Sequence, residues 1–175
     1  GNGAGNWTFL DDNGDMYTWG FDRYNASSGS DSGDSLGQGT EVLYNNIPTK
    51  ICSDVAFIYY ENRAVTKDGK LIEWGKLWEG DSCLPHPVRE NIAKLDYNIY
   101  LTRDGKVYSI PNRENIQLTK PYEESGELIM TGVKDIVLGV PCYALKNDGS
   151  VWTFLRDNMT GEVVQKPEKV AEDVR

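Results

Sequence analysis

The feature that most constrains this chain is a short hairpin pattern that recurs four times. The clearest copy is Tyr143–Phe154, in which Asp148-Gly149 separates two runs rich in β-branched and aromatic residues. An Asp-Gly pair favours a tight hairpin turn because both residues tolerate positive φ. The flanking residues suit a pleated, half-buried strand. The pattern predicts four β-hairpins, near residues 7–20, 63–75, 99–110 and 143–155.

The spacing of the four turn glycines indicates how the hairpins are arranged. Gly14, Gly69, Gly105 and Gly149 lie 55, 36 and 44 residues apart, close to the period of a β-propeller blade. Apolar residues stand both two and three positions after each glycine, so we expect both faces of that strand to be covered, as in stacked sheets. We predict an all-β fold, a β-propeller built from four-stranded antiparallel blades. It has about four repeat units, as a partial or strand-swapped ring, in a single domain spanning 1–175.

A second repeated element precedes the later hairpins. Two apolar residues flank a short polar stretch in each copy, as in Ile51 to Val55 and Val133 to Ile136, and the last copy is Val170 to Val174. That last copy has no hairpin after it, whereas the first hairpin has no such element before it. The strand at 167–175 is therefore predicted to complete the first blade, which would remove two free sheet edges.

The first two hairpins resemble the regulator of chromosome condensation repeat family. The resemblance rests on Thr66–Gly75, on Tyr17–Gly20 and on the Leu36-Gly37-Gln38-Gly39 stretch that follows. The third and fourth hairpins depart from the pattern, since Ile110-Pro111 and Phe154-Leu155 stand where the family has Trp-Gly. The resemblance covers nearly the whole chain and implies a propeller that acts by binding other molecules.

The family's usual ring has seven blades, whereas this chain has material for four. Three arrangements remain open at this point. The chain is a fragment of a larger ring, or two copies associate into a larger ring as a homodimer, or the chain closes alone as a small propeller.

Composition excludes some partners. The net charge of −9 and the lack of a Lys/Arg cluster disfavour nucleic acid. No apolar run approaches the ~20 residues of a membrane span. We expect a soluble protein, with an extracellular or cell-surface location left open, and an unknown protein partner with a basic surface.

The cysteines and the single histidine carry no recognisable chemistry. Cys52, Cys83 and Cys142 form no Cys-x-x-Cys pair, and His86 is too isolated to join them in a zinc site. We interpret the cysteines as small buried apolar residues, with one disulfide possible. We interpret His86 as a loop residue rather than part of a nucleophilic site.

The candidate binding residues are aromatic side chains between the hairpins. Phe21, Tyr24, Tyr44 and Trp78 fall in connecting segments, where a rigid scaffold can present them to a partner. The alternative is that they pack beneath their own loops. Four other aromatic residues follow the repeat and are interpreted as core, namely Trp19, Trp74, Tyr108 and Trp152.

Acidic residues give only weak metal candidates. Asp31 and Asp34 lie in a Ser/Gly/Asp-rich stretch, and Asp11, Asp12, Asn13 and Asp15 surround the first turn, but neither group matches a complete calcium loop. We expect no cofactor and no catalytic residues. The predicted function is a non-catalytic protein-binding scaffold. The alternatives are a carbohydrate-active enzyme or carbohydrate-binding module, and an architectural segment of a larger surface protein.

Overall fold

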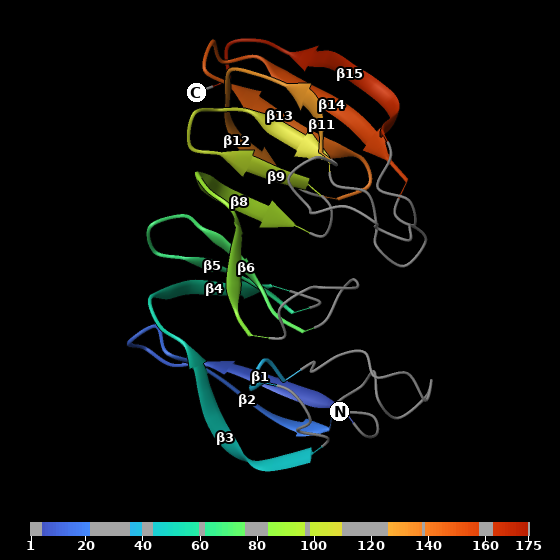
Figure 1. Ribbon diagram of the computed structural model, residues 1–175. Helices are drawn as coiled ribbons and strands as arrows, with labels where there is room; N and C mark the ends of the chain where they lie inside the picture. The colour runs from blue at the N-terminus through green and yellow to red at the C-terminus, as the bar shows by residue number, and fades with distance from the viewer. Residues whose placement is uncertain are drawn as a thin grey trace. The chain divides into compact units, whose positions relative to one another are not determined.

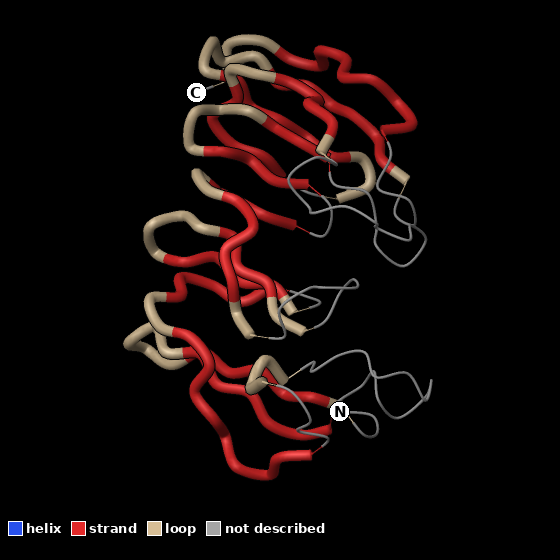
Figure 2. Tube along the Cα trace, in the orientation of Figure 1, coloured by secondary structure: helices blue, strands red, loops and turns tan. Residues whose placement is uncertain are grey.

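The structure is a computed structural model, and its described part consists of strands joined by turns (Figures 1 and 2). It describes residues 5–21, 36–39, 44–59, 62–75, 84–96, 99–109, 126–137, 139–157 and 163–174. Within these ranges no helix forms that is long and apolar enough to cross a membrane.

The described residues form two compact units, Gly1–Glu90 and Asn91–Arg175. Unit 1 holds two antiparallel sheets. Sheet 1 is β1 (Asn6–Leu10), β2 (Met16–Phe21) and β3 (Tyr44–Cys52). Sheet 2 is β4 (Val55–Tyr59), β5 (Arg63–Thr66), β6 (Leu71–Glu73) and β7 (His86–Arg89).

Unit 2 also holds two antiparallel sheets. Sheet 3 is β8 (Ile92–Asp96), β9 (Ile99–Thr102), β10 (Val107–Ser109) and β11 (Glu127–Met130). Sheet 4 is β12 (Val133–Val137), β13 (Cys142–Lys146), β14 (Val151–Arg156) and β15 (Val163–Ala171).

All four predicted hairpins are present. They are β1–β2, β5–β6, β9–β10 and β13–β14, and each is antiparallel. The hairpin forms the two middle strands of sheets 2, 3 and 4, and the first two strands of sheet 1. The turn glycines adopt the positive φ that the sequence predicts, for example +80° at Gly105. The all-β, antiparallel fold is confirmed.

Each unit has a core between its own two sheets. In unit 1, Met16 of sheet 1 packs with Ile72 and Trp74 of sheet 2. In unit 2, Val107 of sheet 3 packs with Phe154 of sheet 4, and Trp152 lies partly buried against the same cluster. In each unit, the residue two positions after the turn glycine of the first sheet thus contacts the residues three and five positions after the turn glycine of the second sheet. Both faces of the middle strands carry apolar residues for this reason.

Backbone hydrogen bonds join each sheet to the next within a unit. The Val55 N–H, at the start of sheet 2, donates to the Gly14 carbonyl in the turn of sheet 1 at 2.9 Å. The Lys67 N–H, in the turn of sheet 2 itself, donates to the Asp54 carbonyl at 2.7 Å and so holds the linking residue in place. In unit 2 the same two bonds run from Val133 to Gly105 and from Asn147 to Gly132. We call each of these pairs of bonds a linkage. The linking residue adopts positive φ, +59° at Asp54 and +71° at Gly132.

The C-terminal segment differs from the prediction. Residues 167–175 were expected to form the inner strand of the first blade, but β15 runs over Val163–Ala171 and pairs with β14 as the outer strand of sheet 4. The two features of a linkage appear only after β15. Asp173 has φ +55°, like Asp54, and the Val174 N–H donates to the Gly149 carbonyl at 3.0 Å, as Val55 does to Gly14. Most of the predicted strand thus belongs to sheet 4, and only Asp173 and Val174 occupy the place that Asp54 and Val55 have at the start of sheet 2.

Sheet 1 departs from the four-stranded pattern. Sheets 2, 3 and 4 each begin with an inner strand, β4, β8 or β12, that pairs with the hairpin. In the described residues of sheet 1, β1 has β2 on one side and no strand on the other. The inner edge of β1 is therefore open in this part of the chain.

A buried ion pair lies in sheet 2. Arg63 and Glu73 are cross-strand partners on β5 and β6, and the Arg63 Nε lies 2.9 Å from a Glu73 carboxylate oxygen. Their side chains are 3% and 1% exposed. A buried charge is tolerated only when its partner and further hydrogen bonds compensate it.

The Gly105 turn gives a test of the linkage. A Cβ at Gly105 would lie 2.9 Å from the Val133 carbonyl oxygen, which is backbone and cannot move aside easily. Gly132 also has positive φ, but a Cβ there meets nothing within 4 Å. We expect Gly132→Ala to lower the free energy of unfolding by roughly 1–2 kcal/mol through backbone strain, and Gly105→Ala by about 2–5 kcal/mol because overpacking is added. Urea unfolding measures both, and equal losses would contradict the close contact.

The ion pair gives a second test. We expect Glu73→Ala to lower the free energy of unfolding by about 3–5 kcal/mol, because it leaves the buried Arg63 charge uncompensated. The double variant Arg63→Met, Glu73→Leu should recover most of that loss in urea unfolding. Asp68→Ala, which breaks an exposed pair with Lys70, is the control and should have a much smaller effect. A loss from Glu73→Ala as small as the control's would refute the buried pair.

Candidate functional site

One face of sheet 1 carries six aromatic side chains. Side chains alternate between the two faces along a strand, and direct cross-strand partners share a face. Three aromatic cross-strand pairs in the β1–β2 and β2–β3 registers therefore lie on the same side of the sheet, because their β2 members alternate. These pairs are Trp7–Trp19, Phe9–Tyr17 and Phe21–Tyr44. We call these six side chains the aromatic face.

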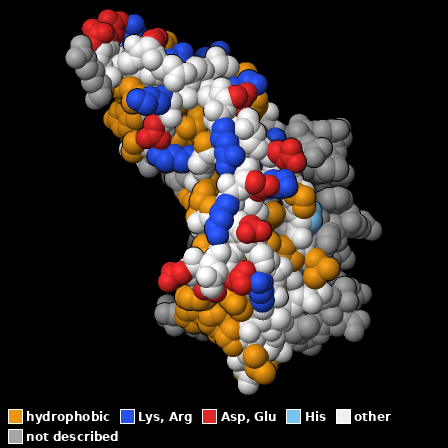
Figure 3. All heavy atoms as spheres, turned by 90° about the vertical axis from the view of Figure 1, so that its left-hand side faces the viewer, with side chains coloured by type: hydrophobic (Ala, Val, Ile, Leu, Met, Phe, Trp, Pro, Cys, Tyr) orange, Lys and Arg blue, Asp and Glu red, His pale blue; other side chains and the backbone are white. Residues whose placement is uncertain are grey.

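The aromatic face is largely exposed. Trp7, Phe9, Phe21 and Tyr44 are 54%, 53%, 45% and 54% exposed, and the other two residues are partly exposed. Figure 3 shows hydrophobic side chains gathered at the lower end of the view, where sheet 1 lies. Single exposed apolar residues are ordinary, whereas a contiguous exposed group is typical of an interaction surface.

Two of the four predicted binding residues come together on this face. The Phe21 and Tyr44 rings pack at a tilt, with their centroids 4.6 Å apart and their planes at 39°. This geometry is favourable for aromatic pairs. Tyr24 and Trp78, the other two predicted anchors, lie outside the described residues.

A hydrogen-bond network holds the strands beneath this pair. The Gln38 amide donates to the Thr18 carbonyl at 2.9 Å, and the Asn45 amide donates to the Gln38 side-chain oxygen at 2.8 Å. The Thr18 hydroxyl donates to the Leu36 carbonyl. Because Asn45 follows Tyr44 directly, the network fixes the backbone that carries the exposed Tyr44 ring. The Leu36–Gly39 stretch thus supports β2 from the buried side.

Trp19 is a correction to the sequence analysis. It was interpreted as core, like Trp74, since both lie five residues after a turn glycine. Trp74 is 1% exposed, but Trp19 is partly exposed because it belongs to the aromatic face. Tyr108 and Trp152 are also only partly buried. Tyr108 stacks on Tyr100 with centroids 5.0 Å apart.

Sequence reasoning missed Trp7 and Phe9. They lie on β1, outside the aligned positions after the glycine that were used to define the repeat. A signal was present, since Trp7 and Phe9 alternate with Thr8 and Leu10 in the way a strand with two different faces requires. That alternation could have placed Trp7 and Phe9 on one face of the strand. It could not have shown that this face is exposed.

The charge beside the aromatic face is balanced. Lys50, the cross-strand partner of Tyr17, forms an ion pair of 2.6 Å with Asp15. The hydrogen bond from the Lys50 ammonium lowers the pKa of the Asp15 carboxyl and raises the pKa of Lys50. The face therefore presents aromatic area next to a neutralised pair.

The carboxylates at the hairpin turns are held in the ionised form. A Lys70 ammonium 2.8 Å away, together with the Thr66 hydroxyl, lowers the pKa of Asp68 to about 2. Lys106 lowers the pKa of Asp104 in the same way, and hydrogen bonds from Ser150 lower that of Asp148. General acids need the opposite shift, so these residues are poorly suited to acid catalysis.

The metal candidates gain no support. The Asp11 carboxylate accepts hydrogen bonds from the Asn13 and Asp15 backbone N–H groups at 3.0 and 2.8 Å, as in an ordinary Asx turn. Asp31 and Asp34 lie outside the described residues. In the residues that the structure describes, no three His, Cys, Asp or Glu side chains gather as metal ligands would.

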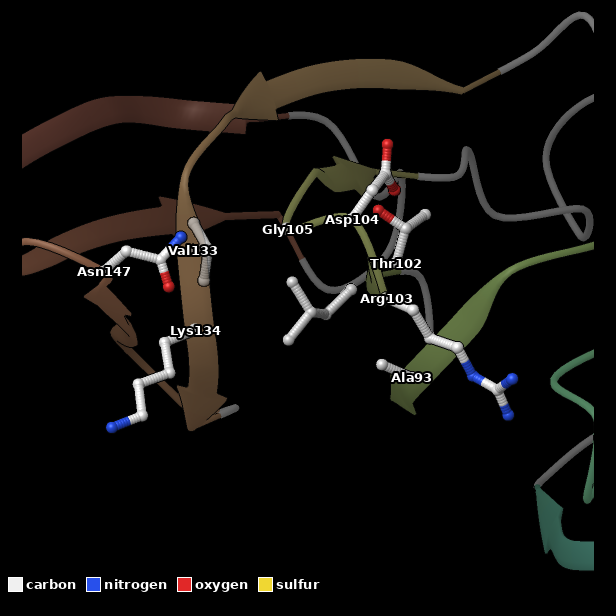
Figure 4. A pocket seen from close by; sticks show the side chains of 9 residues that line it. Ala93, Thr102, Arg103, Asp104, Gly105, Val133, Lys134 and Asn147 are labelled. Atoms are coloured by element: carbon white, nitrogen blue, oxygen red, sulfur yellow. The ribbon is translucent and has the colours of Figure 1, made fainter.

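A polar hollow of ≈ 330 Å³ lies between the turns of sheets 3 and 4. Its lining includes Arg103, Asp104, Lys134 and Asn147 (Figure 4). The Lys134 and Arg103 side chains extend away from each other rather than toward a common point (Figure 4). The hollow has no convergent set of groups that would hold a substrate.

Among the described residues, His86, Cys52 and Cys142 form no catalytic arrangement. His86 begins β7 rather than lying in a loop, and its Nδ1 lies 3.0 Å from the Leu84 carbonyl oxygen. Cys142 is buried and Cys52 is partly buried, and neither forms a disulfide among the described residues. Burial raises the pKa of the Cys52 thiol, which makes it less reactive. Cys83 lies outside the described residues.

Comparison with solved structures identifies the fold. Prp20p of Saccharomyces cerevisiae matches 98% of this chain over 49% of its own, with a TM-score of 0.53 and 19% identity. Yeast RCC1 (Prp20), in its complex with Kap60, matches with a TM-score of 0.53 at 17% identity, covering 98% of this chain and 48% of that one. Human WBSCR16 matches 95% of this chain over 50% of its own, with a TM-score of 0.52 and 20% identity.

The chain thus has the fold of half an RCC1-type β-propeller, with four antiparallel sheets among its described residues, and spans about half the length of each of these structures. The resemblance predicted from the repeats is confirmed at the level of fold. No family model matches the sequence. No curated protein matches it either.

The Asp68 carboxyl gives a test of the turn electrostatics. We expect its pKa to be about 2 and to rise toward 3.8 in Lys70→Met, as followed by NMR titration of the carboxyl carbons. Asp68 binds its proton less tightly when folded than when unfolded. Its stabilising effect is therefore complete above pH ~4 and is lost as the pH falls through about 2. Lys106→Met is the matched control and should move Asp104 instead. An unchanged Asp68 titration in Lys70→Met would contradict the pairing.

Proposed function

We propose that this chain is a non-catalytic protein-binding module and that the aromatic face of sheet 1 is its binding surface. The observation that carries the proposal is the exposure of Trp7, Phe9, Phe21 and Tyr44 on one rigid sheet. Trp and Tyr are enriched among the residues that dominate protein–protein binding energy. A β-sheet presents them at little cost in conformational entropy, because its backbone is already ordered.

The firm attachment of the face to the rest of sheet 1 supports a role in binding. Thr18 and Met16 on the opposite side of β2 are fully buried, so the strand is anchored from below. The hydrogen bonds through Gln38 and Asn45 fix β2 against β3. A protein partner would meet a preformed surface and would lose little affinity to reorganisation.

An enzyme of the glycosidase kind receives less support. Such an enzyme needs two carboxyl groups ~5–10 Å apart across one cleft, one of them with a raised pKa. Asp15, Asp68, Asp104, Asp135 and Asp148 instead have lowered pKa values, because lysines or Ser150 donate hydrogen bonds to them. A carbohydrate-binding role has the aromatic side chains in its favour, but Asp15 and Lys50, two polar side chains beside the face, already bind each other.

The fold is compatible with protein binding. Prp20p has been studied for its binding to Gsp1p and histones, and yeast RCC1 (Prp20) has been solved bound to Kap60. Our proposal takes from these structures only that this fold serves as a protein-binding scaffold. The basic partner expected from the net charge stays a prediction, since the aromatic face itself would favour an apolar surface on the partner.

Photocrosslinking tests the proposal. A photoreactive phenylalanine analogue at position 44 should form discrete adducts with protein, and Trp7→Ser with Phe21→Ser should reduce their yield at least ~10-fold, because loss of anchor residues weakens binding by that much or more. The same analogue at position 128, on β11 and 48% exposed, is the control. Unchanged yield in the double variant, or the same adducts from position 128, would overturn the assignment of this face.

A further inference from the structure

The outer strands of the four sheets can be compared position by position. β3, β7, β11 and β15 each pair with the second strand of a hairpin and, among the described residues, have no strand on their other side. An open edge can pair with any extended chain, and proteins protect such edges with lysine, proline or irregular pairing. The pairing shifts between the second and third residues after the turn glycine in all four sheets, so this irregularity does not distinguish one edge from another.

Three of the four outer strands carry a protective residue at the same register position. This position is the cross-strand partner of the third residue after the turn glycine, and it holds Lys50 in β3, Pro87 in β7 and Lys169 in β15. Both lysines are about half exposed and form ion pairs, with Asp15 and Glu172. β3 and β15 also contain a proline each, which cannot donate a backbone hydrogen bond.

β11 is the outer strand that lacks this protection. The equivalent position holds Leu128, the cross-strand partner of Tyr108. Leu128 is 48% exposed, and the strand Glu127–Met130 contains neither lysine nor proline. The edge of sheet 3 therefore exposes an apolar side chain where the edges of the other sheets have a charge or a proline. An edge of this kind is suited to the addition of another strand.

The backbone of β11 is held in place from the inside of unit 2. Met130 is 8% exposed and pairs with Val107, and both belong to the buried core between sheets 3 and 4. Ile129 packs against the same core. An added strand would thus meet an ordered edge, which lowers the conformational cost of binding.

The side chains beside the edge indicate what kind of residue an added strand would carry. Successive cross-strand partners form one apolar row across sheet 3, namely Leu95, Tyr100, Tyr108 and Leu128. The two tyrosine rings stack with their centroids 5.0 Å apart. Leu95 and Tyr100 are buried, Tyr108 is partly exposed, and the row ends at the half-exposed Leu128. An apolar or aromatic side chain on the added strand would extend the row and cover Leu128.

Charge adds a second requirement for the bound strand. Glu127 is exposed beside Leu128, and it forms no ion pair with a described residue. The residue next to the apolar one on an added strand would lie beside Glu127, because adjacent residues point to opposite faces. A lysine or arginine there would form a cross-strand ion pair. A second copy of this chain is less suited to the edge, since each copy carries a net charge of −9 and two copies repel each other.

We propose that the outer edge of β11 binds an extended peptide segment of a partner protein by strand addition. The segment carries an apolar or aromatic residue beside Leu128 and an adjacent lysine or arginine beside Glu127. Main-chain hydrogen bonds to β11 supply affinity, and the two side chains supply specificity. This site lies on sheet 3, so it does not depend on the proposed function of the aromatic face of sheet 1.

Selection from a random peptide library tests the specificity. Seven-residue peptides displayed on phage are selected on the wild-type chain, and enriched peptides are synthesised with blocked ends for fluorescence polarisation. We expect them to share an apolar or aromatic residue next to a lysine or arginine. Absence of any enriched peptide, or enrichment of acidic peptides, would overturn the proposal.

Variants of the chain test the location. Leu128→Lys gives β11 the residue that sheets 1 and 4 have at this position, and it should weaken peptide binding at least ~10-fold because it removes the apolar anchor. Glu127→Gln should weaken binding about 2–5-fold, as the loss of an exposed ion pair does. Ile47→Lys, at a 67% exposed position on the outer strand of sheet 1, is the matched control and should bind like the wild type. Urea unfolding of all three variants should match that of the wild type.

N-methylated peptides test whether the main chain pairs with β11. Successive N–H groups of a strand point to opposite edges. Methylation of alternate residues on the pairing edge should therefore weaken binding about 10-fold or more, whereas methylation of the residues between them should have a much smaller effect. Equal effects at all positions would refute strand addition.

The remaining outcomes assign the edge to something else or to nothing. Peptides that bind Leu128→Lys as tightly as the wild type would overturn the proposal, even if they lose affinity for the Trp7→Ser, Phe21→Ser variant and so support the aromatic face. Self-association in sedimentation velocity that Leu128→Lys abolishes, without peptide binding, would assign the edge to a second copy and also overturn it. Failure at this edge leaves the proposed function of the aromatic face standing, because the two are tested by different variants.

Discussion

The structure depends on the backbone linkage between a hairpin turn and the start of the next sheet. The linkage consists of two hydrogen bonds. The first residue of the next sheet donates to the turn glycine carbonyl, and the hairpin turn of that next sheet donates to the carbonyl of the linking residue. Glycine at the turn lets the two backbones approach so closely that a Cβ at Gly105 would lie 2.9 Å from the Val133 carbonyl. Because buried backbone groups must be paired, this contact fixes both the spacing of the sheets and their order.

A fixed order gives each sheet two different faces, and that asymmetry explains where the molecule is apolar. Faces at the middle of a unit are buried against each other, which accounts for the complete burial of Met16 and Trp74. The face of sheet 1 with no described neighbour keeps the same kinds of residues, yet exposes them. The aromatic positions of this face therefore follow from the repeat, and their exposure follows from the absence of a covering sheet among the described residues.

Much of this fold could be predicted from the sequence because its signals are local. One Asn-Gly and three Asp-Gly turns, with the apolar positions around them, predicted four hairpins at the right places, and the repeat predicted the antiparallel sheets. The pairing of Phe21 with Tyr44 could not be predicted, because it depends on a register across a long connection between β2 and β3. The exposure of Trp19 depends on which sheet lies over it, and identical spacing at Trp74 produced complete burial.

The C-terminal strand is a second feature whose position could be predicted only in part from the sequence. The motif from Val170 to Val174 was found by its likeness to the Ile51 to Val55 element, and the Val174 hydrogen bond confirms that alignment. The sequence pattern could not show that the first residues of the motif end sheet 4, whereas its last two residues resemble the start of a following sheet. That division depends on the positive φ at Asp173, a backbone feature that a single acidic residue does not reveal.

The central proposal is that the aromatic face of sheet 1 binds a protein partner. Hydrogen exchange measured by mass spectrometry, with and without a protein captured by the photoreactive residue at position 44, tests this most directly. The account predicts that amides of β1 and β2 become more protected when that protein is bound, while those of β9 and β10 stay unchanged. Equal exchange of β1 and β2 with and without the bound protein would contradict the proposal.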